Sequence, residues 1–100
     1  MPDVIRLDDA EVARRSAALP GWQFRDGALH RELVFRDFVD AFSFMTSVAL
    51  TAERLSHHPE WRNVYNVVTI RLTTHDAGGV SENDLVMAAE MSRIHQRLAG

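Results

Sequence analysis

WQFRDGALHRELVF, residues 22–35, contains the most informative local signal in this sequence. Residues of alternating character flank the dipeptide Asp26-Gly27, and Asp-Gly between such runs is the strongest short-range indicator of a β-hairpin. We therefore expect two antiparallel strands joined by a tight turn at residues 26–27.

Helices are predicted on both sides of this hairpin. Asp8 and Asp9 precede the run AEVARR (10–15), which predicts a short helix with acidic residues at its positive end. Pro20 and Gly21 then end it. After the hairpin, Asp37 is placed to cap a long helix that begins near residue 38 and, because Pro59 follows, ends near residue 57.

The long helix has two apolar faces and one narrow polar stripe. The stripe comprises Asp40, Ser43, Ser47 and Thr51; one apolar face comprises Phe38, Phe42, Met45 and Ala49; the other comprises Val39, Phe44, Val48 and Leu55. A surface helix of a monomer needs only one apolar stripe. We therefore expect a second subunit to cover the other face, although a central helix wrapped by its own chain is the alternative.

The remaining sequence predicts further strand and a last helix. Residues 61–75 are rich in β-branched and aromatic residues, which favours strand, but they contain no glycine or proline turn. The residues alone therefore leave open whether this region is one bent strand or two. Ser81 and Asp84 resemble a capping box that opens a helix whose core residues recur at helical spacing: Met87, Met91, Ile94 and Leu98.

Length and composition restrict the class of protein. The chain has 100 residues, 46% of them hydrophobic and 25% charged, which predicts one domain over residues 1–100. No apolar run is long enough for a membrane span or resembles a signal peptide, and there is no cysteine. We therefore expect a cytoplasmic protein without a membrane partner. A net charge of -3 without a basic cluster argues against nucleic acid as a direct partner.

Histidines are the strongest candidates for chemistry. His57 and His58 are adjacent at the predicted end of the long helix, and His75 lies at the end of the second strand region. Glu53 precedes His57 by four residues, so we expect its carboxylate to orient and charge that imidazole. Such a histidine can act as a general acid or base. Each residue taken singly also fits an ordinary surface role, and we assign His30 and His95 to surface structure.

Other kinds of site are less well supported. His57, His58, His75, Glu53 and Asp76 provide enough ligands for zinc, but adjacent histidines diverge and no metallopeptidase spacing is present. The sequence also lacks a glycine-flanked nucleophilic serine and a phosphate-binding glycine loop. We expect no metal.

A longer pattern makes the histidine cluster specific. The sequence ERLSHHPEW (53–61), followed by NVYN (63–66), by Thr74-His75, and by Gly79, Ser81 and Asp84, resembles the signature of the pterin-4a-carbinolamine dehydratases. In animals the same family is called the dimerisation cofactor of a homeodomain transcription factor. The resemblance also includes Gly21-Trp22 and the helix from Phe38 to Glu53, so it covers nearly the whole chain beyond the first helix.

This resemblance implies a fold and an activity. The fold is two-layer α+β, with a four-stranded antiparallel sheet and helices on one face, in the order α-β-β-α-β-β-α, and it divides residues 61–75 into two strands. The activity is the hydro-lyase reaction that converts a 4a-hydroxytetrahydropterin to quinonoid dihydropterin and water, which recycles the pterin after aromatic amino-acid hydroxylation. The resemblance also implies homodimers or homotetramers and an aromatic amino-acid hydroxylase as a partner. It implies neither a metal nor an organic cofactor.

The resemblance also assigns roles to residues. His57 and His75 exchange protons with the 4a hydroxyl, His58 mainly holds the pterin, and Glu53 orients His57. The backbone around Ser56 and from Thr73 through Thr74 to Asp76 provides polar contacts to the ring, and Trp22 forms a nearby apolar wall. Asp84 is interpreted as a helix cap outside the chemistry.

Two other functions remain open at this point. One is an oligomeric binding or regulatory module without turnover, because the animal proteins stabilise a transcription-factor dimer. The other is an enzyme of molybdopterin metabolism that acts on a different pterin. The complete histidine set favours chemistry over pure scaffolding.

Overall fold

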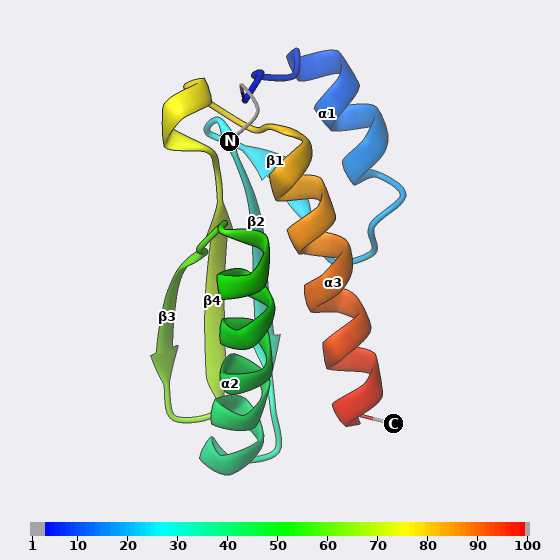
Figure 1. Ribbon diagram of the computed structural model, residues 1–100. Helices are drawn as coiled ribbons and strands as arrows, with labels where there is room; N and C mark the ends of the chain where they lie inside the picture. Colours follow the sequence, from blue (N-terminus) through cyan, green and yellow to red (C-terminus); the bar gives the residue numbers. More distant parts are fainter. Residues whose placement is uncertain (1–3, 100) are drawn as a thin grey trace.

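The computed structural model describes residues 4–99 and has two layers (Figure 1). Its elements follow the order α1 (Asp9–Ser16), β1 (Gln23–Arg25), β2 (Ala28–Val34), α2 (Phe38–Leu55), β3 (Glu60–Val64), β4 (Val67–Leu72), a short 3-10 turn η1 (His75–Ala77) and α3 (Glu82–Ala99). The predicted α+β class and the order of helices and strands are confirmed.

The four strands form one antiparallel sheet in the order β1-β2-β4-β3. The predicted hairpin joins β1 to β2, with Arg25 opposite Ala28 and both turn residues at positive φ, 51° for Asp26 and 73° for Gly27. The 61–75 region is two strands, as the family resemblance implied. Their turn carries Tyr65 at φ 51° and is bracketed by the Asn63 side chain, which donates to the carbonyls of Tyr65 and Val67.

The core lies between the sheet and the helices. Leu29 and Leu33 of β2 and the alternate β4 residues Val68, Ile70 and Leu72 are buried. In Figure 1, α2 and α3 lie side by side across this one face of the sheet. The helices cover that face with a larger set of buried side chains: Ala41, Phe44, Val48, Ala52, Leu85, Met87, Ala88, Met91 and Ile94.

Several sequence predictions about the helices need correction. Helix α2 ends at Leu55 rather than near His57, because Ser56 adopts the left-handed conformation (φ 53°, ψ 38°). Val39 does not belong to the same face as buried Phe44, because it lies with the exposed apolar residues, and Thr51 of the polar stripe is buried. His95 is not a plain surface residue, because its ring packs edge-on against Phe35 at 5.5 Å between centroids.

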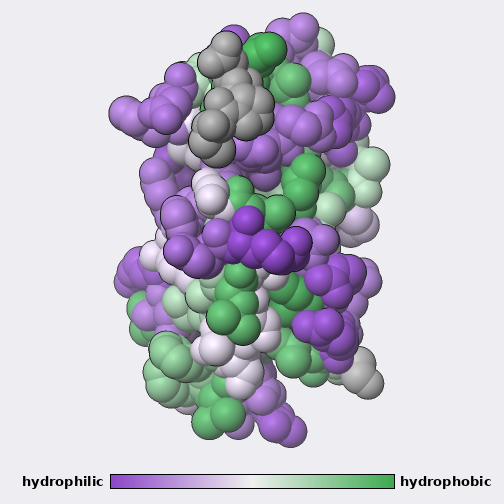
Figure 2. All heavy atoms as spheres, viewed as in Figure 1, coloured by the Kyte–Doolittle hydropathy of each residue, from purple (hydrophilic) through white to green (hydrophobic). Residues whose placement is uncertain are grey.

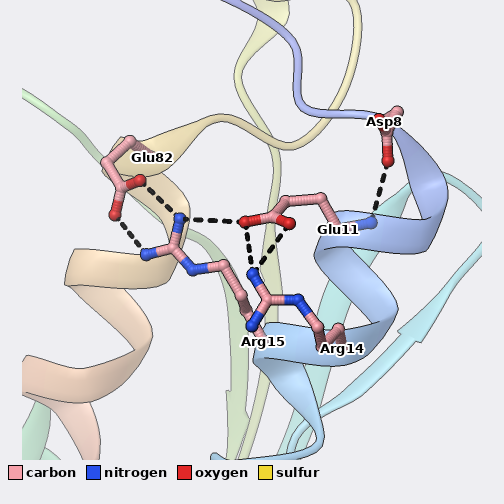
Figure 3. A network of polar contacts seen from close by, with 5 residues as sticks. All are labelled: Asp8, Glu11, Arg14, Arg15 and Glu82. Atoms are coloured by element: carbon pink, nitrogen blue, oxygen red, sulfur yellow. Dashed lines mark hydrogen bonds and ion pairs between the residues drawn. The ribbon is translucent and has the colours of Figure 1, made fainter.

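A polar network fixes α1 against the beginning of α3 (Figure 3). Both guanidinium Nη atoms of Arg15 donate to the carboxylate of Glu82 at 2.6 Å, in the bidentate geometry that favours arginine–carboxylate pairs. This pairing raises the pKa of Arg15 and lowers the pKa of Glu82. At the other end of α1, Asp8 caps the helix through the amide of Glu11, as predicted. The first turn of α3 is therefore held in place by an ion pair with α1.

None of the helices in the described part of the chain is long and apolar enough to cross a membrane.

Candidate active site

Three segments meet at one end of the sheet and form a hollow. The residues after α2, the start of β3 and the η1 turn gather near the beginning of α3 (Figure 1). The hollow has a volume of about 270 Å³ and is lined by residues of all these segments: Val4, Ser56, His57, His58, Glu60, Thr73, Thr74, His75, Asp76 and Asn83. All three candidate histidines therefore line one cavity, although His75 lies 17 residues or more along the chain from the other two.

The left-handed turn at Ser56 explains how adjacent histidines reach different places. The amide of His57 donates to the carbonyl of Ala52 at 3.0 Å, which closes the end of the helix in the manner of a Schellman motif. After this turn the two side chains diverge. His57 is buried, with 9% of its surface exposed, whereas His58 is exposed.

The prediction that Glu53 pairs with His57 is wrong. Glu53 does not reach His57; its Oε1 atom lies 3.0 Å from Nε2 of His58, in a pair that is exposed on both sides. Our prediction assumed that the helix continues through His57, which would place residues 53 and 57 on one helical face. Because the helix ends at Leu55 and Ser56 reverses the backbone, His58 takes that position instead.

Asp84 makes the contact with His57 that we expected of Glu53. Its Oδ1 atom lies 2.5 Å from Nε2 of His57, and the aspartate is fully buried. Its Oδ2 atom accepts from the amide of Ser81, which is the predicted helix-capping contact, at 2.9 Å. The assignment as a cap is thus confirmed, and the same carboxylate also contacts His57, a contact that the interpretation as a cap did not include.

A signal for this buried aspartate is present in the sequence. Asp84 lies three and seven residues before Met87 and Met91, so it continues the apolar stripe of α3 rather than its solvent face. A buried carboxylate requires hydrogen-bond donors around it, and a histidine is the natural candidate. Glu60, Asn83 and Val4 also line the hollow and were not predicted as site residues; Glu60 lies within the family pattern at residues 53–61, whereas Val4 and Asn83 lie outside it.

Trp22 is not a wall of this site. It is 6% exposed and belongs to the hydrophobic core, where its indole N–H donates to Ser92 Oγ at 3.0 Å and the guanidinium of Arg31 lies 5.9 Å from its ring. The prediction fails because Trp22 packs into the hydrophobic core and against α3 rather than beside the hollow.

The site contains no arrangement suited to a metal ion among residues 4–99, where no group of three or more potential ligands converges. The bond between His57 Nε2 and Asp84 leaves one imidazole nitrogen of His57 available. The hollow therefore brings together three imidazoles, two of which have a carboxylate partner, and imidazoles are the side chains most often used for general acid–base chemistry.

Fold and site together define an α+β protein with a histidine-lined hollow at one end of an antiparallel sheet. Comparison with known proteins makes this more specific: the family model for pterin 4 alpha carbinolamine dehydratase matches residues 5–94. The chain belongs to the pterin-4a-carbinolamine dehydratase family, a family of hydro-lyases, as its sequence pattern indicated.

Individual relatives agree with this membership. Proteins from Rhodopseudomonas palustris strain BisB18 (49% identical, 96% of this chain and 97% of the relative) and Prochlorococcus marinus strain MIT 9303 (60% identical, 82% and 85%) carry the name pterin-4-alpha-carbinolamine dehydratase, assigned provisionally. A crystal structure of a transcriptional coactivator/pterin dehydratase from Brucella melitensis matches with a TM-score of 0.87 and 47% identity, covering 90% of this chain and 98% of that one.

Proposed function

We propose that this protein dehydrates a 4a-hydroxytetrahydropterin to the quinonoid dihydropterin by histidine general acid–base catalysis. The observation that carries the proposal is the convergence of His57, His58 and His75 on one hollow in a chain of this family. The comparisons support the dehydratase activity, and the geometry supports the assignment to histidines.

The reaction needs two proton transfers. The lone pair of pterin N5 forms the C4a=N5 bond while the C4a–O bond breaks, so the departing hydroxyl must receive a proton to leave as water. N5 must then lose its own proton. One proton is given and one is taken, so the enzyme returns to its starting state. Each transfer from a well-placed side chain contributes about 10²–10⁴-fold.

The residue roles follow the pocket, with one revision. His57 and His75 exchange protons with the 4a hydroxyl and N5, and His58 holds the ring. Asp84 replaces Glu53 as the group that orients His57, and Glu53 supports His58 from the rim. The backbone around Ser56 and from Thr73 through Thr74 to Asp76 remains the proposed source of polar contacts to the pterin, and no metal or organic cofactor is invoked.

The test is the rate of carbinolamine loss with and without the protein. His57→Gln is the preferred variant, because the glutamine amide still offers a donor to buried Asp84, whereas His57→Ala leaves that carboxylate without it and costs about 1–3 kcal/mol. We expect His57→Gln to lower kcat at least 100-fold with the fold intact by circular dichroism.

His30→Gln is the matched control, because His30 lies on β2, outside the hollow. It should keep the wild-type rate. An unchanged rate in His57→Gln, or no acceleration by the wild-type protein, would reject the proposal. Running the assay on a molybdopterin-type pterin as well tests whether the protein is instead an enzyme of molybdopterin metabolism. A link to an aromatic amino-acid hydroxylase and a cytoplasmic location stay predictions.

A second function has a specific observation in its favour. The structural neighbour from Brucella melitensis is named a transcriptional coactivator as well as a pterin dehydratase. Here α2 presents large apolar side chains to solvent: Phe38, Val39, Phe42 and Leu50 are 48%, 69%, 54% and 73% exposed. Figure 2 shows hydrophobic residues over α2 amid hydrophilic surroundings. We propose that a second copy of this chain covers the face in a homodimer or homotetramer. The competing outcome is that this face binds a helix of another protein, as a binding or regulatory module would require.

A further inference from the structure

Two buried hydroxyl groups lie behind the histidine pocket and have no role in the mechanism above. They belong to Thr74, the residue before η1, and to Ser81, the residue before α3. Thr74 is 7% exposed and Ser81 is 1% exposed. Their hydroxyl oxygens lie 2.6 Å apart, and Thr74 Oγ1 lies 2.7 Å from Oδ2 of Asp84. The two hydroxyls therefore extend the His57–Asp84 pair into a buried chain of four side chains.

The number of hydroxyl protons determines the direction of the two hydrogen bonds that Thr74 makes with Asp84 and Ser81. Thr74 donates its single hydroxyl proton to the carboxylate of Asp84. Because a hydroxyl has only one proton, the Thr74–Ser81 contact must use the proton of Ser81, with Thr74 as the acceptor. Together with the amide of Ser81, Oδ2 of Asp84 thus receives two donors and its Oδ1 faces His57.

Ser81 turns its hydroxyl away from the usual task of an N-terminal helix residue. In a capping box the serine oxygen accepts from the amide three residues on. Here the amide of Asp84 donates to the backbone carbonyl of Ser81 at 3.1 Å, and the serine hydroxyl points to Thr74 instead. The helix end is therefore arranged so that both the amide and the hydroxyl of Ser81 take part in the buried chain.

The consequence reaches the reactive imidazole. An ionised Asp84 that is held by two donors on one oxygen can only accept at the other, so Nε2 of His57 must carry its proton. In the neutral imidazole the Nδ1 atom, which makes no hydrogen bond within residues 4–99, is then the nitrogen left with a lone pair. We propose that Thr74 and Ser81 are positioning residues that fix the Nε2–H tautomer of His57, and that Nδ1 is its proton-exchanging atom.

The catalytic meaning of this inference rests on the proposed dehydratase function, but the tautomer does not. The test therefore combines two readouts: ¹⁵N chemical shifts of the histidine rings in the labelled, ligand-free protein, with His57 assigned from its loss in His57→Gln, and the kinetics of carbinolamine loss. The wild-type protein should show a protonated Nε2 and an unprotonated Nδ1 at His57.

Thr74→Val keeps the shape of the side chain and removes the hydroxyl. We expect it to convert the His57 shifts to those of a tautomer mixture and to lower kcat about 10-fold, since hydrogen bonds to charged groups are the stronger class. Thr74→Ser restores the hydroxyl and should restore both readouts. Ser81→Ala should produce the same spectral change in weaker form, and it serves if Thr74→Val does not fold.

The outcomes separate the two proposals. Wild-type shifts that report Nδ1–H, or shifts that stay the same in Thr74→Val and Ser81→Ala, overturn the positioning role whether or not the protein is a dehydratase. Shifts that respond as expected in a protein without activity support the positioning role and reject the proposed function instead.

Discussion

At the residue scale, exposure distinguishes the two histidine–carboxylate pairs of the site. His57 and Asp84 are buried, so water does not screen their interaction, and the loss of one partner leaves a buried polar group unsatisfied. The side chains of His58 and Glu53 are 66% and 83% exposed, and pairs of that kind contribute little. The two carboxylates should therefore affect different kinetic constants.

Glu53→Gln removes one charge and little volume from the exposed pair. Because Glu53 contacts the residue that we assign to holding the ring, we expect KM to rise about two- to fivefold with kcat nearly unchanged. Asp84→Asn is the comparison, since it removes the charge behind His57, and we expect it to lower kcat about 100-fold or more. Steady-state kinetics of both variants provide the measurement. Equal losses of kcat would contradict this division of roles.

At the scale of elements, α3 carries two functions on one helix. Its first turn holds Asp84, and its last turns place His95 against the rings of Phe35 and Phe44. Burial lowers the pKa of His95, and the positive charge of Arg31 lowers it further. A half-buried neutral imidazole therefore links the far end of α3 to α2.

This lowered pKa predicts a pH dependence of stability. The unfolded chain binds a proton at His95 near its ordinary pKa of 6.5, before the folded protein does, so the free energy of unfolding falls as pH drops below about 6.5. The slope from this one residue is at most about 1.4 kcal/mol per pH unit.

His95→Phe keeps a ring and removes the titration. Urea unfolding of both proteins at pH 7.5 gives the effect of packing alone, and the difference between them should then change in favour of the variant on acidification to pH 5. A difference that is the same at both pH values would show that His95 does not contribute.

At the scale of the whole molecule, the exposed apolar face of α2 is the feature that a lone subunit leaves unsatisfied. A hollow of about 440 Å³ on this face is lined by Phe38, Val39, Phe42 and three small hydroxyl residues, Ser43, Thr46 and Ser47, without a charged side chain. A two-fold axis would place the same uncharged surface of a second chain against it.

Phe42→Glu places a charge in the centre of this face and should convert the oligomer to a smaller species, as measured by light scattering with size-exclusion chromatography. Val86→Glu is the matched control, because Val86 is also an exposed apolar helix residue (42%) but lies on α3. A wild-type mass equal to the 11.3 kDa of one chain would contradict the proposed oligomer.

The sequence alone determined the elements whose signals are local. Asp26-Gly27 specified its hairpin because few residue pairs tolerate two positive φ angles, and Asp37 and Asp8 specified helix starts through contacts within one turn. The histidines of the site were also found in advance, since their grouping follows from the family pattern.

The tertiary structure decided which groups are partners. Ser56 adopts the left-handed conformation and ends α2 two residues before the predicted end. As a result His57 pairs with Asp84, 27 positions away, instead of with Glu53. The tertiary structure likewise placed Trp22 in the core and His95 between aromatic rings. Such pairings depend on how whole helices and strands pack against one another. The spacing of residues along a helix predicts contacts only between residues within that helix.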